Sequence, residues 1–235
     1  MRAIFKDTME EELKAAFLGA QGLGAKGFFV DVGANDPRAA SQTWSLEQRG
    51  WTGVLIEPQP DLADALRRER TGKVYAVACS EPANAGKTLT LHLAGFQSSV
   101  VEDFYVAGVR RHGSIAVPVM TLDQVLEDAG APCPLDFVSI DVEGHALEVL
   151  AGFTLSRWQP RLLLMEDHVQ DLSLHRYLTQ QGYRWFRRTG LNSWYVPESS
   201  PEPVGLFGKL QFLRKYHLGR RFRNLREAKR RLLRQ

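Results

Sequence analysis

The 235-residue sequence has few cysteines and no long apolar run. Cys79 and Cys133 are its two cysteines, and they lack the spacing of a zinc site. So few cysteines give no reason to expect an oxidising compartment, and we expect a cytoplasmic protein. No stretch approaches the roughly 20 apolar residues of a membrane span, and the first thirty residues lack a signal-peptide layout. We therefore expect neither a membrane-spanning protein nor a disulfide-stabilised secreted one.

Apolar segments that are typical of buried strands alternate with helical segments through most of the chain. Residues 28–32, 53–56 and 74–78 are expected to be strands, with helices over 39–49 and 61–70 between them. Strands alternating with helices over short loops are the signature of a parallel sheet covered by helices on both faces. The sequence therefore predicts an α/β fold.

Composition divides the rest of the chain. We expect an N-terminal helix and loop at 1–27, and a main domain at 28–197 that closes with a β-hairpin. Residues 84–118 interrupt the strand–helix alternation, and we expect them to form an antiparallel insert over the strand ends. Three prolines and two serines mark a linker within 198–205 and just before it. Residues 206–235 form a tail that we treat separately.

Acidic residues stand where the apolar strands stop. They are Asp31, Glu57, Asp141, Glu166 and Asp167. The carboxyl ends of parallel strands share one edge, which is where open α/β sheets bind their ligands. Acids are also common at loop starts and helix caps, but four strand ends with acids favour a ligand site along this edge.

The glycine fingerprint of dinucleotide-binding proteins is missing after the first strand. Gly33 is followed by Ala34, Asn35, Asp36 and Pro37, and a pyrophosphate here would face Asp31. An acid at the end of the second strand, here Glu57, is placed to bind a ribose diol. These features favour S-adenosylmethionine, which has a ribose and positive charges but no phosphate, over a nicotinamide dinucleotide.

Four segments resemble the FkbM family of S-adenosylmethionine-dependent methyltransferases. They are Asp31-Val32-Gly33-Ala34-Asn35, Ile56-Glu57-Pro58, Thr121-Leu122-Asp123 and Ser139-Ile140-Asp141-Val142-Glu143-Gly144-His145. The similarity covers about residues 28–170. It implies a Rossmann-like class I methyltransferase fold, whose seven-stranded sheet has an antiparallel last strand, and O-methylation of a sugar, glycan or related natural product. Pro37 departs from the general motif, and we expect a shifted loop there.

The resemblance also implies roles for individual residues. Asp31, Gly33 and Asn35 would hold the methionine part of the cofactor, and Glu57 its ribose. Ala78 and Cys79 would lie beside the adenine, although Cys79 fits an inert core residue equally well.

Methylation of a hydroxyl requires a group that accepts its proton. His145, four residues after Asp141 at a helix start, is the first candidate, and His168 is the alternative. Either histidine could instead be structural. Asp141, Glu166 and Asp167 form a candidate Mg²⁺ site, because Mg²⁺ prefers carboxylate oxygens. The alternative is that Glu166 is a loop acid and Asp167 a helix cap.

The tail at 206–235 holds 11 Lys/Arg and one acid, whereas the preceding residues hold 19 Lys/Arg and 26 acids. Apolar residues are interleaved with the basic ones. This pattern fits a helix on an anionic membrane surface, at the inner face of the membrane, or a tail packed on the acidic body of a monomer or homo-oligomer. Nucleic acid is less supported, because no binding module accompanies the charge.

Two alternatives to the methyltransferase remain at this point. One is an NAD(P)-dependent oxidoreductase on the same kind of sheet. The other is a non-catalytic module that docks on a membrane or a partner through its tail.

Overall fold

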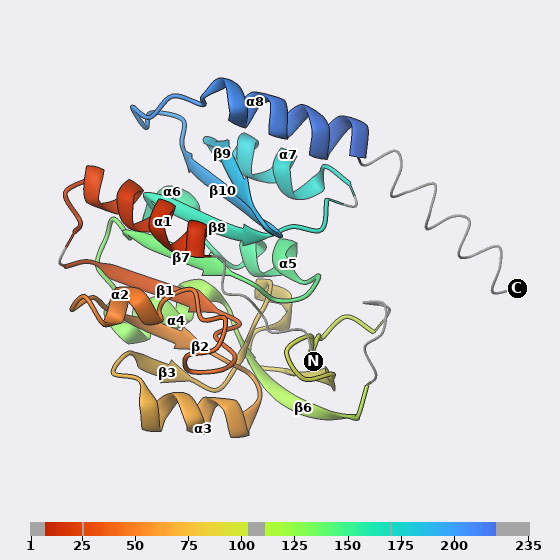
Figure 1. Ribbon diagram of the computed structural model, residues 1–235. Helices are drawn as coiled ribbons and strands as arrows, with labels where there is room; N and C mark the ends of the chain where they lie inside the picture. The colour runs from red at the N-terminus through yellow and green to blue at the C-terminus, as the bar shows by residue number, and fades with distance from the viewer. Residues whose placement is uncertain (1–7, 25, 103–110, 170, 220–235) are drawn as a thin grey trace, which may run out of the picture.

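A computed structural model describes residues 8–24, 26–102, 111–169 and 171–219, and its centre is a seven-stranded sheet (Figure 1). The strand order is β3-β2-β1-β7-β8-β10-β9. Neighbouring strands are parallel except β10, which is antiparallel to β8 and to β9. The strands are β1 (Phe28–Val32), β2 (Thr52–Ile56), β3 (Lys73–Tyr75), β7 (Phe137–Ile140), β8 (Leu162–Glu166), β9 (Tyr183–Thr189) and β10 (Asn192–Pro197). The prediction of an α/β fold with an antiparallel last strand is confirmed.

Both faces of the sheet are covered by helices, so its central strands are buried on both sides. In β1, Phe29 packs toward one face and Val30 toward the other, each with 0% exposure. This explains why the strand is continuously apolar rather than alternating. One face is covered by α1 (Thr8–Ala20), α2 (Trp44–Glu47) and α3 (Pro60–Glu69). The other is covered by α4 (Leu122–Ala129), α5 (Ala146–Ala151), α6 (Leu155–Trp158) and α7 (Ser173–Gln180).

The helix expected over 39–49 is much shorter in the structure and is limited to the four residues of α2. A turn precedes it, in which the Asp36 carboxylate accepts hydrogen bonds from the backbone N–H groups of Arg38 and Ala39. Pro37 cannot donate a helical hydrogen bond. The longer helix over 39–49 was therefore wrong, and the shift of the loop at Pro37 relative to the family motif stays a prediction.

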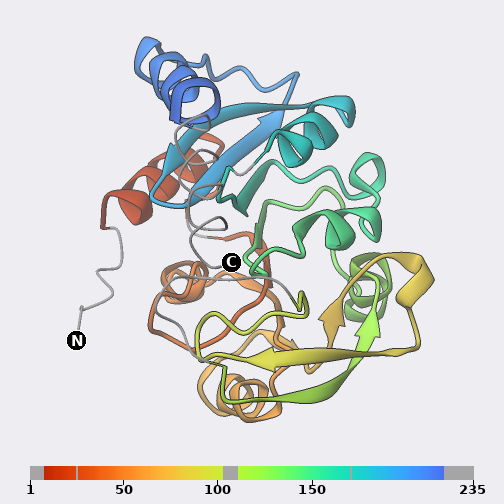
Figure 2. The ribbon, with the colours of Figure 1, turned by 90° about the vertical axis from the view of Figure 1, so that its right-hand side faces the viewer.

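The strand expected over 74–78 is split between two sheets. After β3 the chain leaves the main sheet, and β4 (Ala78–Cys79) pairs with β6 (Gly113–Met120). β6 pairs antiparallel with β5 (Thr88–Leu93), and a short 3₁₀ helix, η1 (Pro82–Asn84), precedes β5. Figure 2 looks onto the carboxyl ends of the main sheet and shows β5 and β6, in yellow and yellow-green, crossing in front of its lower half. Here the described part of the insert has the antiparallel character that was expected.

The described part of the C-terminal tail is helical and packs on the body. It consists of α8 (Leu206–Phe212), continued by a π-helical segment, η2 (Leu213–Leu218). Tyr216 has 0% exposure and belongs to the core. Residues 220–235, which carry most of the tail's charge, lie outside the described residues. Among the helices that are described, none combines the length and apolar character needed to cross a membrane.

Candidate active site

A pocket of about 540 Å³, including its open mouth, lies at the carboxyl ends of β1, β2 and β7. The predicted cofactor residues Gly33, Asn35, Glu57, Ala78 and Cys79 all line it. The insert closes one side with Leu91, Phe96 and residues 98–100. The structure thus brings together residues that are up to about 110 positions apart in the sequence, from Gly33 to Glu143.

Gly33 allows the backbones of two neighbouring strand ends to approach each other. It has a φ of +82°, and a Cβ there would lie 1.8 Å from the carbonyl oxygen of Asp141. The glycine is therefore required by contact between protein segments, whatever ligand the pocket takes. This close approach joins the loop after β1 to the end of β7.

Glu57 is held in place by the backbone of two loops. One carboxylate oxygen accepts a hydrogen bond from the N–H of Asn35 and the other from the N–H of Gln59, each at 2.9 Å. Burial raises the pKa of Glu57, and these two donors oppose the rise. Each carboxylate oxygen can accept further hydrogen bonds. Glu57 is therefore an oriented acceptor at the pocket wall, as the binding of a ribose diol requires.

Asp31 does not line the pocket, in contrast to the role implied by the resemblance. It is 2% exposed, and its carboxylate accepts a hydrogen bond of 2.7 Å from the Thr43 hydroxyl. The guanidinium of Arg70 also binds that hydroxyl, together with Glu47 and the carbonyl of Pro37. Burial raises the pKa of Asp31. In this structure Asp31 organises the loop behind the pocket.

Ala78 and Cys79 belong to an apolar wall of the pocket that also includes Ile56, Val77 and Leu91. Burial raises the pKa of the Cys79 thiol to about 12. A thiol with this pKa is not a nucleophile at neutral pH. Such a wall fits a flat heterocycle, and Cys79 acts in it as a small apolar side chain.

His145, the first candidate for the base, lies at the same wall. Its Nε2 is 3.0 Å from the hydroxyl of Ser80, the residue after Cys79, and its Nδ1 is 3.5 Å from Glu148. Burial lowers the pKa of His145. Both ring nitrogens face protein groups, and the histidine stands on the side where the resemblance places the adenine.

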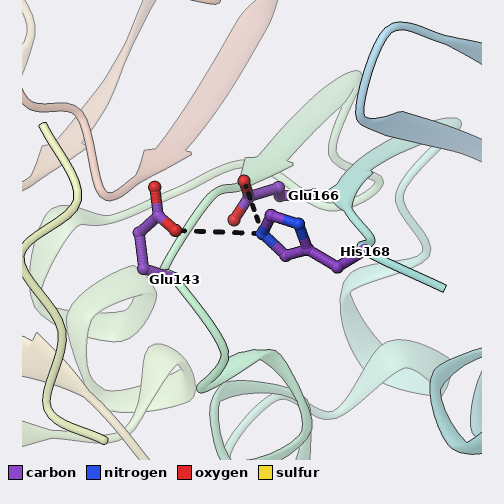
Figure 3. A group of neighbouring side chains, drawn as sticks. All are labelled: Glu143, Glu166 and His168. Atoms are coloured by element: carbon purple, nitrogen blue, oxygen red, sulfur yellow. Dashed lines mark ion pairs between the residues drawn. The ribbon is translucent and has the colours of Figure 1, made fainter. Parts of the chain in front are cut away.

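His168, the second candidate, is flanked by two carboxylates at the ends of β7 and β8. Figure 3 shows Glu143 and Glu166 pointing toward its ring. The His168 Nε2 is 3.1 Å from Glu166 and 3.9 Å from Glu143. The carboxylates of Glu143 and Glu166 raise the pKa of His168 to about 10. The ring is therefore an imidazolium at neutral pH.

Asp141 completes this group, and we call Asp141, Glu143, Glu166 and His168 the β7–β8 cluster. Burial and the neighbouring Glu166 raise the pKa of Asp141 well above its usual value. Burial also raises the pKa of Glu143, whose Oε2 is buried without a hydrogen bond from the described residues. Asp141 and Glu143 line the pocket, so the cluster borders it. Neighbouring carboxylates repel one another when they are ionised. This repulsion favours the uptake of a proton or a cation by the cluster.

The predicted metal ligand Asp167 points away from this cluster. Its carboxylate accepts hydrogen bonds from the Val169 N–H and the Tyr216 hydroxyl, and it lies 3.9 Å from Arg188. The metal set of Asp141, Glu166 and Asp167 is therefore not brought together. Within the described residues, Glu143, Glu166 and His168 each offer one atom, all within 4.8 Å of one another.

The sequence interpretation missed two residues that shape the site. Glu143 belongs to the motif that ends in His145, but no role was given to it. Its left-handed backbone, with φ of +46°, turns the chain directly after the strand end. Arg70 was counted only as part of a helix, because nothing in its sequence context indicates that its guanidinium is buried.

Comparison with known proteins gives a family match that covers every residue lining the pocket. The model of a family described as Methyltransferase FkbM domain matches residues 31–185. The chain is also 29% identical over 113 residues to a protein of Haloferax volcanii called hexuronic acid methyltransferase AglP. That alignment covers 48% of this chain and 46% of the relative, so the chain spans about half the length of the relative that it matches.

Proposed function

Because the chain belongs to the FkbM family of methyltransferases, we propose that it transfers the methyl group of S-adenosylmethionine to a hydroxyl oxygen of a sugar or glycan. The observation that supports this most is the position of the β7–β8 cluster. Asp141 and Glu143, whose carboxyl groups have raised pKa values, border the pocket that Gly33, Asn35 and Glu57 also line. The nicotinamide-dependent oxidoreductase is set aside, since the family match covers the residues of the pocket.

The pocket has the chemistry that S-adenosylmethionine requires. Glu57 would accept hydrogen bonds from the ribose, and the wall of Ile56, Val77 and Ala78 would contact the adenine. The nearby Asp141 would favour the positive charges of the methionine end. When bound, this cofactor supplies a methyl group made electrophilic by its sulfonium.

The protein's own task is to hold an acceptor oxygen in line with that methyl group and to take up its proton. Correct positioning alone can lower the barrier by about 7–11 kcal/mol. We propose Glu143 as the general base, in place of His145. Its carboxylate lines the pocket, its raised pKa makes it a better proton acceptor, and its Oε2 accepts no hydrogen bond within the described residues, with the imidazolium of His168 3.9 Å away. His168 would orient this carboxylate and Glu166 by its positive charge.

The name of the relative suggests a second kind of methyl acceptor, because a hexuronic acid offers a carboxylate oxygen as well as hydroxyl oxygens. A carboxylate needs no base, and the carboxyl groups of the β7–β8 cluster would repel it. We therefore propose that the product is a methyl ether and not a methyl ester. Mild alkali separates the two outcomes, because it hydrolyses a methyl ester and leaves a methyl ether intact.

The test begins with cofactor binding. S-adenosylhomocysteine should raise the melting temperature of the protein, whereas NAD⁺ and NADP⁺ should not. Labelled S-adenosylmethionine is then incubated with neutral and uronic-acid-containing glycans, and the label is followed through alkaline treatment. Binding without label transfer to any glycan class would contradict the acceptor, and the absence of binding would contradict the cofactor and favour a non-catalytic module.

A second proposal for the same cluster is that it binds a divalent cation, because Glu143, Glu166 and His168 each offer one neighbouring ligand atom. The two carboxylates suit Mg²⁺, while the imidazole suits transition metals better. The residues that would hold Mg²⁺ are therefore Glu143 and Glu166. Dialysis against EDTA should abolish turnover, and added Mg²⁺ should restore it, if the ion rather than a free carboxylate is used. Unchanged turnover would remove the metal.

A further inference from the structure

Helix α8 and the start of η2 display an apolar stripe that no other described residue covers. It consists of Leu206, Phe207, Leu210 and Leu213, which are 75%, 79%, 56% and 50% exposed. Their spacing places them on one face of the helix. We call these four residues the α8 stripe. Large apolar side chains that gather in this way on a surface mark a site of interaction.

The opposite face of the helix is fixed on the body. Gly208, Phe212 and Tyr216, spaced by four residues, point inward. Phe212 and Tyr216 stack with ring centroids 4.5 Å apart, and Trp185 packs on Phe212. The side chain of Gln211 bonds both the N–H and the carbonyl of Arg188. The α8 stripe is therefore exposed because the opposite face of its helix packs on the body of the protein.

Basic residues accompany the stripe. Lys209, Arg214 and Lys215 lie on the same helical segment, and no acidic residue lies between 206 and 219. The sequence that follows, residues 220–235, adds eight Lys/Arg and one acid. A partner for this surface must offer apolar groups together with negative charge. A bilayer with anionic lipids does both, since the side chains enter the acyl boundary while the charges meet the headgroups.

We propose that the α8 stripe and the basic residues beside it bind the protein to an anionic membrane surface. The helix also connects this surface to the site. The hydroxyl of Tyr216 donates a hydrogen bond of 2.5 Å to Asp167, which follows Glu166 of the β7–β8 cluster directly. Figure 1 shows α8 running along the β9–β10 side of the sheet toward the end where β8 stops. A bilayer bound there would meet the protein along the β9–β10 edge of the sheet, next to β8 and its cluster residue Glu166.

The experiment is co-sedimentation of the full chain with vesicles of phosphatidylcholine alone or of phosphatidylcholine mixed with the anionic lipid phosphatidylglycerol. We expect binding to the anionic vesicles and at least tenfold weaker binding to the neutral ones. The double variant Leu206→Asp with Phe207→Asp should bind anionic vesicles at least tenfold more weakly. Both side chains are exposed, so the variant should fold and keep its melting temperature.

Two control variants make the result specific. Leu191→Asp changes a leucine of similar exposure, 52%, on the β9–β10 turn and should bind like the wild type. Arg68→Glu reverses an exposed charge on α3, at the other edge of the sheet, and should also bind normally, whereas Lys209→Glu should weaken binding. Equal effects of the stripe variant and Leu191→Asp would overturn the proposal.

Other partners of the same surface give different outcomes. If the stripe joins two copies of this chain, light scattering will show a dimer that the double variant dissociates, and vesicles will bind neither protein. If the basic residues bind nucleic acid, the chain will bind a DNA duplex of mixed sequence and will not bind the vesicles. Either result would overturn membrane binding, and neither depends on whether the protein transfers methyl groups.

Discussion

The strand-end edge of the sheet has two halves, and both carry buried acids, but the acids have different partners. In the half formed by β1 and β2, Asp31 and Glu57 accept hydrogen bonds from Thr43 and from backbone N–H groups. In the half formed by β7 and β8, carboxyl groups face one another and share one imidazolium. An acid with its own donors is a fixed acceptor, whereas crowded acids bind protons more tightly. The first half is therefore suited to binding, and the second to moving a proton.

The strongest test of this difference is Glu143→Gln in the β7–β8 half. Loss of a general base should lower kcat by about 10²–10⁴-fold, because the amide cannot take up the proton of the acceptor. The Kd for S-adenosylhomocysteine should stay within about threefold of the wild type, far less than the tenfold change that 1.4 kcal/mol represents. Steady-state kinetics and calorimetry measure the two effects. The matched control is Glu12→Gln, an exposed glutamate on α1 with wild-type kinetics expected. A loss of binding with normal kcat would reverse the roles of the two halves.

The complementary change is Glu57→Gln in the β1–β2 half. Both carboxylate oxygens accept backbone N–H groups, and an amide has one oxygen, so one of these protein donors loses its acceptor. The ribose loses a charged acceptor as well. A hydrogen bond to a charged group contributes about 1.5–3 kcal/mol, so we expect cofactor binding to be weakened by about 10- to 150-fold. At saturating cofactor, kcat should be nearly unchanged. A large fall in kcat at saturation would show that this half also takes part in the chemistry.

The third test concerns the support behind the β1–β2 half. Thr43→Val removes the hydroxyl that links Asp31 to Arg70 and should lower the free energy of unfolding by about 1–2 kcal/mol. Thr43→Ser keeps the hydroxyl and should lose much less. Urea denaturation measures both. Equal losses for the valine and serine variants would mean that packing of the methyl group, rather than the hydrogen bond, is what matters.

The fourth test is a pH dependence of stability that belongs to the β7–β8 half. The folded state raises the pKa of His168 to about 10, above the value of about 6.5 in an unfolded chain. The stabilisation by the imidazolium is therefore complete below pH 6.5 and is lost as the pH rises toward 10. The difference in unfolding free energy between the wild type and His168→Gln, measured in EDTA, should shrink over this interval. A difference that stays constant would show that the carboxylates do not hold the proton.

Much of the fold could be predicted because its signals are local. The apolar run Phe28–Val32 and the acids at strand ends depend on neighbours in the sequence. The split of the third strand between two sheets could not be predicted, since Ala78 pairs with Val119 of β6, a strand about 40 positions further along the chain. The helix expected over 39–49 failed for a similar reason. Buried Arg70, which follows α3, binds one carbonyl and two hydroxyl groups of that loop and holds it in a non-helical conformation.

The sequence by itself determined that acids would gather at one edge of a parallel sheet, because strand ends in such a sheet share an edge. It determined equally that Gly33 would be followed by a loop without the dinucleotide glycines. Only the tertiary structure decided what each acid does there. In the structure the Asp31 carboxylate accepts a hydrogen bond from Thr43, and that of Asp167 accepts one from Tyr216. Glu143 instead lies at the pocket, beside Glu166 and His168. The reason is that a side chain's charge state and partners depend on neighbours that the fold supplies from distant parts of the chain.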